Sequence, residues 1–151
     1  VRQAFGDGVF CGDSLDRRAL GQLVFSDSQK RDELNAILHP LILREITRQL
    51  DAFDAPERLV IGDIPLLYEC GMQTLFDAVW VVSVPRETQI QRLAQRDGLD
   101  RTQAERRIDA QMPLAQKEQL ADAVIHTDGT IEQTQRQIDA LLCRLAQRRK
   151  P

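Results

Sequence analysis

The sequence predicts an α/β fold built on a parallel sheet. Three runs rich in apolar and β-branched residues, at 59–62, 78–84 and 123–125, have the length of strands and end in turn-forming residues. Helical periodicity follows the second and third runs, and the order strand, helix, strand implies right-handed parallel crossovers. With 151 residues, 42% of them hydrophobic and 28% charged, the chain has the size and composition of one domain with its own core.

The first third of the chain is predicted to be helical after a glycine-rich start. Residues 1–14 contain three glycines and are predicted to form a loop. From Leu15 onward the apolar residues fall on one helical stripe. This pattern predicts a helix that is capped by Asp13 or Ser14 and ends near Phe25.

A longer helix is predicted after the cap cluster Ser26-Asp27-Ser28, with apolar residues in the 3.6-residue period. Pro40 interrupts it, because proline removes a backbone donor and disfavours helical backbone at His39. A kink or a break between two helices is therefore expected there. His39 is either a core histidine at the bend, which is the commoner role of a lone histidine, or a polar side chain that faces a site.

The stretch from Asp63 to Glu69 follows the first apolar run and closes at Cys70-Gly71. In a parallel sheet the ligand crevice lies outside the carboxyl ends of the strands, where a carboxylate can orient a hydroxyl or a metal-bound water. Asp63 is therefore a candidate functional residue. The alternative is a turn-forming aspartate that caps a helix starting near Pro65.

The run 78–84 is of the type that is buried on both faces of a parallel sheet. Pro85 ends this strand and is expected to start a helix. The predicted buried stripe of that helix consists of Ile90, Leu93 and Ala94.

Two capping boxes predict further helix starts, Thr102 with Glu105 and Thr130 with Gln133. Met112-Pro113 is expected to end the first of these helices. The apolar stripe of the last helix is predicted to consist of Ile131, Ile138, Leu141, Leu142 and Leu145.

The net charge of −3 argues against a general nucleic-acid surface. Arginines nevertheless concentrate in one segment: Arg86, Arg92, Arg96, Arg101, Arg106 and Arg107. A guanidinium group suits phosphate binding. The alternative, which the residues alone favour, is a solvated helical face balanced by Glu87, Asp97, Asp100, Glu105 and Asp109.

Composition also excludes several classes of protein. No apolar run approaches the roughly 20 residues of a membrane-spanning helix, and the first residues do not read as a signal peptide. Three distant cysteines fit the reducing cytoplasm and argue against a disulfide framework. Two separated histidines do not make a zinc site with these cysteines.

Several separated motifs together resemble the dephospho-CoA kinase family, in the same order and over essentially the whole chain. In chain order they are Leu15-Asp16-Arg17 with Val24-Phe25, Leu38-His39-Pro40-Leu41-Ile42, Asp63-Ile64-Pro65-Leu66-Leu67-Tyr68-Glu69, Arg96-Asp97, Arg107-Ile108-Asp109-Ala110-Gln111, and Ala121-Asp122-Ala123-Val124-Ile125 with Gly129. The resemblance implies a three-layer fold like that of P-loop NTPases. It also implies transfer of the γ-phosphoryl group of ATP, with Mg²⁺, to the ribose 3'-hydroxyl of dephospho-CoA.

The resemblance implies a role for each matched position. Asp63 would lie beside Mg²⁺ and the phosphates. The acceptor side would comprise Arg17, His39, Leu66, Leu67 and Glu69. The lid over the phosphates would comprise Arg96, Arg107 and Gln111, and the border of the adenine would comprise Thr127, Asp128 and Gly129. The single kinase-like domain would divide into an acceptor region at 1–56, a lid region at 86–120, and a core at 57–85 and 121–151.

One departure from the family is clear. Its members begin with a strand and a Walker A loop, GxxxxGK[ST], and this sequence contains no such loop. The expectation is a chain truncated at its N-terminus, which lacks the central strand and the catalytic base and turns over negligibly alone. How the sheet tolerates the loss stays open between partial unfolding, strand exchange in a dimer and an N-terminal segment outside this chain, and an open sheet edge favours self-association. The alternatives are a P-loop-less CoA- or nucleotide-binding regulatory paralogue and another relative of the nucleoside-monophosphate kinases.

Overall fold

The computed structural model describes residues 1–53 and 59–148, and the chain divides into two compact units, Val1–Leu75 and Phe76–Pro151. Each unit is described by itself. The predicted boundary between residues 56 and 57 lies outside the described residues, so the predicted division into acceptor, core and lid regions stays a prediction.

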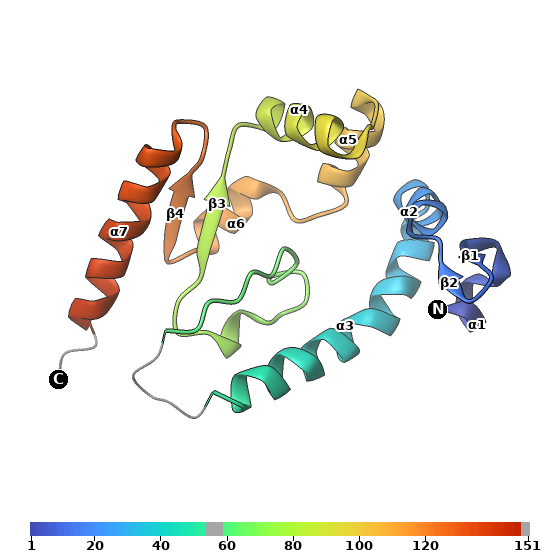
Figure 1. Ribbon diagram of the computed structural model, residues 1–151, viewed down its shortest axis with the longest axis horizontal. Helices are drawn as coiled ribbons and strands as arrows, with labels where there is room; N and C mark the ends of the chain where they lie inside the picture. The colour runs from blue at the N-terminus through green and yellow to red at the C-terminus, as the bar shows by residue number, and fades with distance from the viewer. Residues whose placement is uncertain (54–58, 149–151) are drawn as a thin grey trace. The chain divides into compact units, whose positions relative to one another are not determined.

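The first unit begins with short elements and not with the predicted loop. They are α1 (Arg2–Phe5), the 3₁₀ turn η1 (Asp7–Val9) and an antiparallel hairpin of β1 (Phe10–Cys11) and β2 (Ser14–Leu15) (Figure 1). The hairpin turns at Gly12, whose φ of 62° suits glycine. Two-residue strands are too short to leave a periodic signal in the sequence, which is why the loop prediction was wrong.

Helix α2 (Arg17–Ser26) is capped by Asp16 and not by the predicted Asp13 or Ser14. The Asp16 carboxylate accepts hydrogen bonds from the backbone N–H groups of Arg18 and Ala19 at 2.9 and 3.0 Å. The predicted caps were wrong because the hairpin and its turn already use both residues. Leu20 and Val24 of α2 are buried against Val9 and form the core of this part of the chain.

Helix α3 (Ser28–Asp51) runs through Pro40 without interruption, so the predicted break is wrong. Its N-cap is Asp27, as the cap cluster predicts. Proline removes one intrahelical hydrogen bond, whereas the turns on both sides of it keep theirs. The three residues after Pro40 are exposed: Leu41, Ile42 and Leu43.

The predicted strand at 59–62 is absent. These residues have no regular secondary structure, and Leu59 and Ile61 are 48% and 78% exposed. A strand forms through pairing with a neighbour, and in the described part of the first unit the only sheet is the β1–β2 hairpin. The sequence pattern therefore correctly marks an apolar run, but the structure gives that run no partner.

The second unit contains the parallel sheet that the sequence predicts. Strand β3 (Trp80–Ser83) pairs in parallel with β4 (Ala123–His126), and Trp80 lies opposite Ala123. The helices between and after them, drawn from yellow to red in Figure 1, are α4 (Arg86–Asp97), α5 (Arg101–Asp109), α6 (Leu114–Leu120) and α7 (Ile131–Arg148). The predicted α/β class with a parallel sheet is confirmed.

Burial of β3 on both faces was not borne out. Val81 and Ser83 are 8% and 5% exposed, whereas Val82 is 61% exposed. Successive side chains of a strand point to opposite faces, and α6 covers the face of Ser83, whose hydroxyl donates to Glu118 of that helix. Val82 points to the face that is open in the described part of this unit.

In the second unit, the predicted start of α4 is confirmed, whereas the predicted start of α5 and one residue of the buried stripe of α7 are wrong. Helix α5 starts two residues earlier than the predicted Thr102 box, because Asp100 and Gln103 form the capping box. Ile131 is 82% exposed and does not belong to the buried stripe of α7. Pro85 precedes α4 as predicted, and Ile90 is buried at 4% exposure. Among the described residues, no helix has the length and hydropathy needed to cross a membrane.

Candidate functional site

The stretch from Asp63 to Gly71 is a compact turn that places one acidic side chain in solvent. Its backbone folds back through hydrogen bonds from Cys70 N to the Leu66 carbonyl at 2.9 Å and from Met72 N to the Leu67 carbonyl at 2.9 Å. Leu67 and Met72 are 9% and 1% exposed, and their burial anchors the turn. Asp63 is exposed at its start.

The same turn holds Glu69 next to the thiol of Cys70. Burial, and secondarily the negative charge of Glu69, raises the pKa of Cys70. Both effects favour the neutral thiol over the thiolate. Glu69 is half-buried, and Leu66 beside it is half-buried as well.

The other predicted acceptor residues lie on the two helices of the same unit. Arg17 is exposed at the first position of α2. His39 lies in the middle of α3, and its Nε2 is buried without a hydrogen-bond partner among the described residues. A buried ring nitrogen without a partner costs free energy, which a bound group could recover by hydrogen bonding.

Two predicted lid residues meet at a single carboxylate in the second unit. Arg96 donates to Asp97 through Nε at 2.8 Å, and Arg107 of α5 donates to the other oxygen of the same carboxylate. Gln111, the third, is exposed just after α5, where its N–H donates to the Ile108 carbonyl at 3.1 Å. Asp97 is one of the acids predicted to balance the arginines, and the structure places it between two of them.

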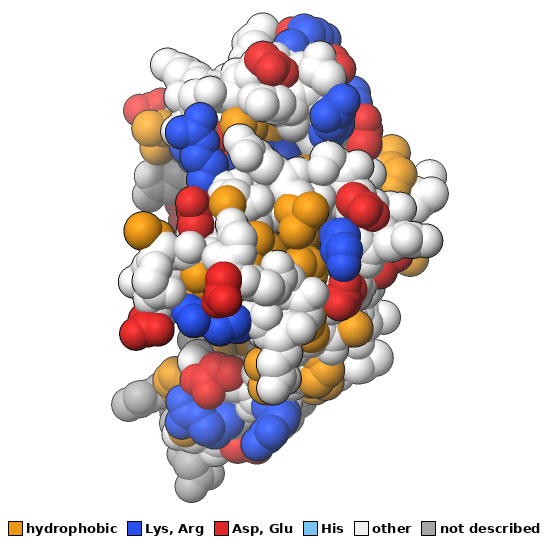
Figure 2. Space-filling model, turned by 90° about the vertical axis from the view of Figure 1, so that its right-hand side faces the viewer, with side chains coloured by type: hydrophobic (Ala, Val, Ile, Leu, Met, Phe, Trp, Pro, Cys, Tyr) orange, Lys and Arg blue, Asp and Glu red, His pale blue; other side chains and the backbone are white. Residues whose placement is uncertain are grey.

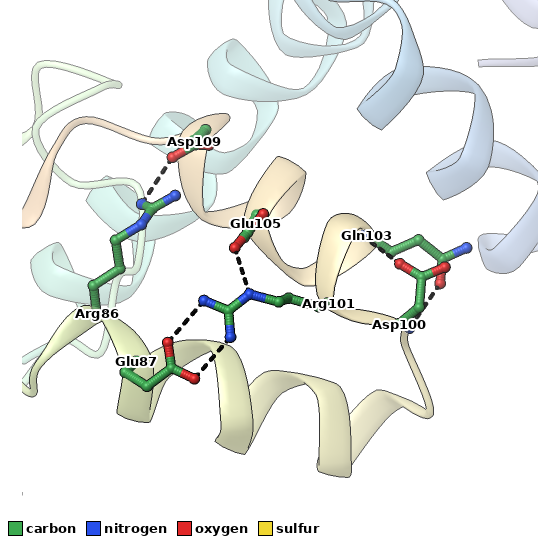
Figure 3. Close-up of polar contacts among 7 residues, drawn as sticks. All are labelled: Arg86, Glu87, Asp100, Arg101, Gln103, Glu105 and Asp109. Atoms are coloured by element: carbon green, nitrogen blue, oxygen red, sulfur yellow. Dashed lines mark hydrogen bonds and ion pairs between the residues drawn. The ribbon is translucent and has the colours of Figure 1, made fainter.

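Further arginines of the segment are paired within the α4–α5 region. Arg86 lies 2.8 Å from Asp109, and Arg101 makes a two-point contact with Glu87 at 2.8 Å and a bond to Glu105 at 2.9 Å (Figure 3). The predicted balancing acids therefore do pair with arginines, except Asp100, which caps α5. Basic and acidic side chains also intermingle on the face drawn in Figure 2.

The loop after β4 contains the residues predicted to border adenine. Thr127 is tied to the end of β3 by a hydrogen bond from its N–H to the Ser83 carbonyl at 2.9 Å. Arg92 of α4 donates to the Thr127 carbonyl at 2.8 Å. Asp128 and Gly129 follow, both exposed, before the Thr130–Gln133 capping box that the sequence predicts. Arg92 belongs to the clustered arginines, but its contact with Thr127 joins segments 35 residues apart and leaves no local signal in the sequence.

The described residues contain no cluster of side chains that could hold Mg²⁺ by themselves. No group of three or more His, Cys, Asp or Glu side chains in ranges 1–53 and 59–148 could hold a metal. Mg²⁺ in phosphotransfer sites usually binds one or two carboxylates, with substrate phosphates and water as the other ligands. The exposed carboxylate of Asp63 fits that limited requirement.

Comparisons with known proteins point to one enzyme family. The family model described as dephospho-CoA kinase matches residues 1–133. The dephospho-CoA kinase of Bacillus licheniformis is 46% identical over 145 residues, which cover 94% of this chain and 72% of that protein. The dephospho-CoA kinase of Shouchella clausii is 45% identical over 140 residues, which cover 91% of this chain and 71% of that protein.

Solved structures agree with these sequence matches. The crystal structure of a Thermus thermophilus protein superposes with a TM-score of 0.73 at 36% identity and covers 95% of this chain and 74% of that one. The dephospho-CoA kinase of Campylobacter jejuni superposes with a TM-score of 0.61 at 24% identity, covering 94% of this chain and 71% of that one, and at that identity it supports the fold alone.

Proposed function

The chain belongs to the dephospho-CoA kinase family, and on that premise we propose that it serves the ATP-dependent phosphorylation of the ribose 3'-hydroxyl of dephospho-CoA. The observation that carries the proposal is the family match over residues 1–133, which includes the motifs around His39, Asp63 and Arg107.

Residues of the first unit are proposed to bind the acceptor. The guanidinium of Arg17 is exposed at the start of α2 and can donate to the phosphates of dephospho-CoA. The buried Nε2 of His39 supports the same role, because a hydrogen bond to the acceptor would satisfy it. Leu66, Leu67 and Glu69 would form the wall of this site on the turn that Met72 anchors.

Residues of the second unit are proposed to meet ATP. Arg96, Arg107 and Gln111 would close over the phosphates and stabilise the charge that develops during transfer. The side chain of Arg96 is 73% exposed, so a phosphate can reach its guanidinium while Asp97 remains in contact with it. Thr127, Asp128 and Gly129 would border the adenine.

Asp63 is proposed to face the metal and phosphates. Bound Mg²⁺ would neutralise phosphate charge, and Asp63 is the protein carboxylate proposed to hold it. The role of Asp63 is thus to bind and orient, and the proposal assigns no proton transfer to it.

A second candidate function is a CoA- or nucleotide-binding regulatory paralogue, which would bind its ligand without transferring a phosphoryl group. Calorimetry separates the two functions. The regulatory module would bind CoA with the same affinity whether ATP is present or not, whereas a kinase holds acceptor and nucleotide in one site and should show coupling between them.

The acceptor assignment has a matched test in two neighbouring arginines. Arg17 and Arg18 both lie in the first turn of α2 and are exposed, but only Arg17 is proposed to bind the acceptor. Arg17→Met should weaken dephospho-CoA binding about tenfold, the loss expected for one charge-assisted contact. Arg18→Met removes the same charge and should leave the affinity nearly unchanged. Equal losses in both variants would contradict the assignment.

A further inference from the structure

Two arginines from different helices converge on one carboxylate at the end of α4. Arg96 donates from Nε to Oδ1 of Asp97 at 2.8 Å and from a terminal nitrogen to Oδ2 at 3.3 Å. Arg107, from α5, donates to the same Oδ2. One carboxylate therefore holds both of the arginines that are proposed above to meet the phosphates of ATP.

Asp97 occupies a position that is unfavourable for an acid. It is the last residue of α4, where the negative end of the helix dipole disfavours a carboxylate. The hydrogen bond from Arg96 and, to a smaller extent, the charge and hydrogen bond of Arg107 hold the pKa of Asp97 below its ordinary value. A residue that breaks a local rule and is compensated by two arginines indicates a purpose beyond helix stability.

The exposures of the three side chains show which of them needs to be held. The side chain of Arg96 is 73% exposed, whereas those of Asp97 and Arg107 are 24% and 31% exposed. Asp97 and Arg107 are thus the better enclosed pair, and Arg96 takes its orientation from Asp97. Without that contact the long side chain of Arg96 would regain its rotamer freedom in solvent.

We infer that Asp97 is a positioning residue that holds Arg96 and Arg107 together for one phosphoryl group of ATP, an inference that rests on the proposed function. Two guanidinium groups repel each other when the carboxylate between them is removed. Donors that are oriented before binding give the higher affinity, because less side-chain freedom is lost on binding. Removal of the Asp97 carboxylate therefore has two opposite effects on the affinity for ATP. Loss of a negative charge beside an anion site should by itself tighten ATP binding, whereas loss of orientation should weaken it.

Calorimetric titration of the whole chain with Mg²⁺-ATP measures whether the affinity for ATP rises or falls. Asp97→Asn should weaken ATP binding about fivefold to tenfold, in spite of the more positive charge. Asp97→Glu, which keeps the charge, should recover part of the loss. The matched control is Asp109→Asn, which removes the same charge from the ion pair with Arg86 (Figure 3). In Asp109→Asn the affinity for ATP should be unchanged or slightly higher. None of the three variants should change the affinity for dephospho-CoA.

The outcomes separate this inference from the proposed function. Unchanged or tighter ATP binding by Asp97→Asn overturns the positioning role, as does an equal loss in Asp109→Asn. A wild-type chain that binds no ATP overturns it as well. If the three variants show the expected ATP affinities and the wild-type chain transfers no phosphoryl group to dephospho-CoA, the positioning role is supported and the proposed function is contradicted.

Discussion

Gln137 of α7 completes the hydrogen bonding of His126 at the outer edge of the parallel sheet. Its Nε2 donates to the His126 carbonyl at 2.8 Å, and the His126 N–H donates to its Oε1 at 2.9 Å. One side-chain amide thereby satisfies two backbone groups that a further strand would otherwise satisfy. Such pairing also blocks an edge that could associate with another chain.

Loss of this amide should destabilise the sheet. Gln137→Ala leaves two backbone groups of β4 without their partner, and the free energy of unfolding should fall by about 1–2 kcal/mol in urea titrations. Gln135→Ala, an exposed change on the same helix, should alter it by less than about 0.5 kcal/mol. Similar losses in the two variants would show that helix propensity, and not the edge contact, sets the result.

The packing of α4 on α5 should control the lid arginines. Ala104 is fully buried on α5, and overpacking a buried site costs about 1–3 kcal/mol. Ala104→Leu should therefore lower stability and, by displacing Arg107 from Asp97, weaken ATP binding in calorimetry. Ala115→Leu makes the same change at an exposed site on α6 and should do neither. Full ATP affinity in Ala104→Leu would contradict the predicted link between helix packing and the lid.

Glu45 should make stability depend on pH in the acid range. Hydrogen bonds from Arg48 and then Gln49 lower the pKa of Glu45 from 4.5 to about 2. Because the folded pKa is depressed, the stabilisation is fully present above pH 4.5 and is lost as the pH falls toward 2. Glu45→Gln should thus unfold at a lower temperature than wild type at pH 7. The two melting temperatures should converge as the pH is lowered, and a constant difference would contradict this origin.

Asp63 should matter for transfer and not for folding. Its carboxylate is exposed, so Asp63→Asn should leave the free energy of unfolding within about 0.5 kcal/mol of wild type. Phosphoryl transfer should fall at least about tenfold, because the proposed protein ligand of Mg²⁺ is lost. Asp51→Asn, at the exposed end of α3, is the control and should retain activity. Unimpaired transfer in Asp63→Asn would remove Asp63 from the site.

Local chemistry predicted several elements of the fold well. Pro85 and the periodicity after it predicted α4, and Thr130 with Gln133 predicted the start of α7, because these signals lie within one turn of the chain. The strand at 59–62 was predicted wrongly for the opposite reason. Its apolar character is local, but a strand also requires a paired neighbour, which a short run of sequence does not reveal.

In the candidate site, too, the features with a local signal could be predicted from the sequence, and those that depend on tertiary contacts could not. Asp63 could be singled out because it directly follows an apolar run, and Arg96 and Arg107 because they belong to a dense group of arginines. Asp97 as their common partner could not be predicted, since the convergence of Arg96 and Arg107 depends on how α5 packs on α4. The N-caps of α2 and α5 differ from the predicted residues for a related reason. Several neighbouring side chains can accept the first backbone N–H groups of a helix, and tertiary contacts decide which of them does.

The identity of the phosphoryl acceptor tests the account most directly. The chain, at high concentration with Mg²⁺ and ATP, would be given dephospho-CoA and a panel of nucleoside monophosphates, and the products analysed by mass spectrometry. Dephospho-CoA should gain one phosphoryl group on its ribose, and the other acceptors should not react. Phosphorylation of a nucleoside monophosphate in place of dephospho-CoA, or no transfer together with ATP-independent binding of CoA, would contradict it.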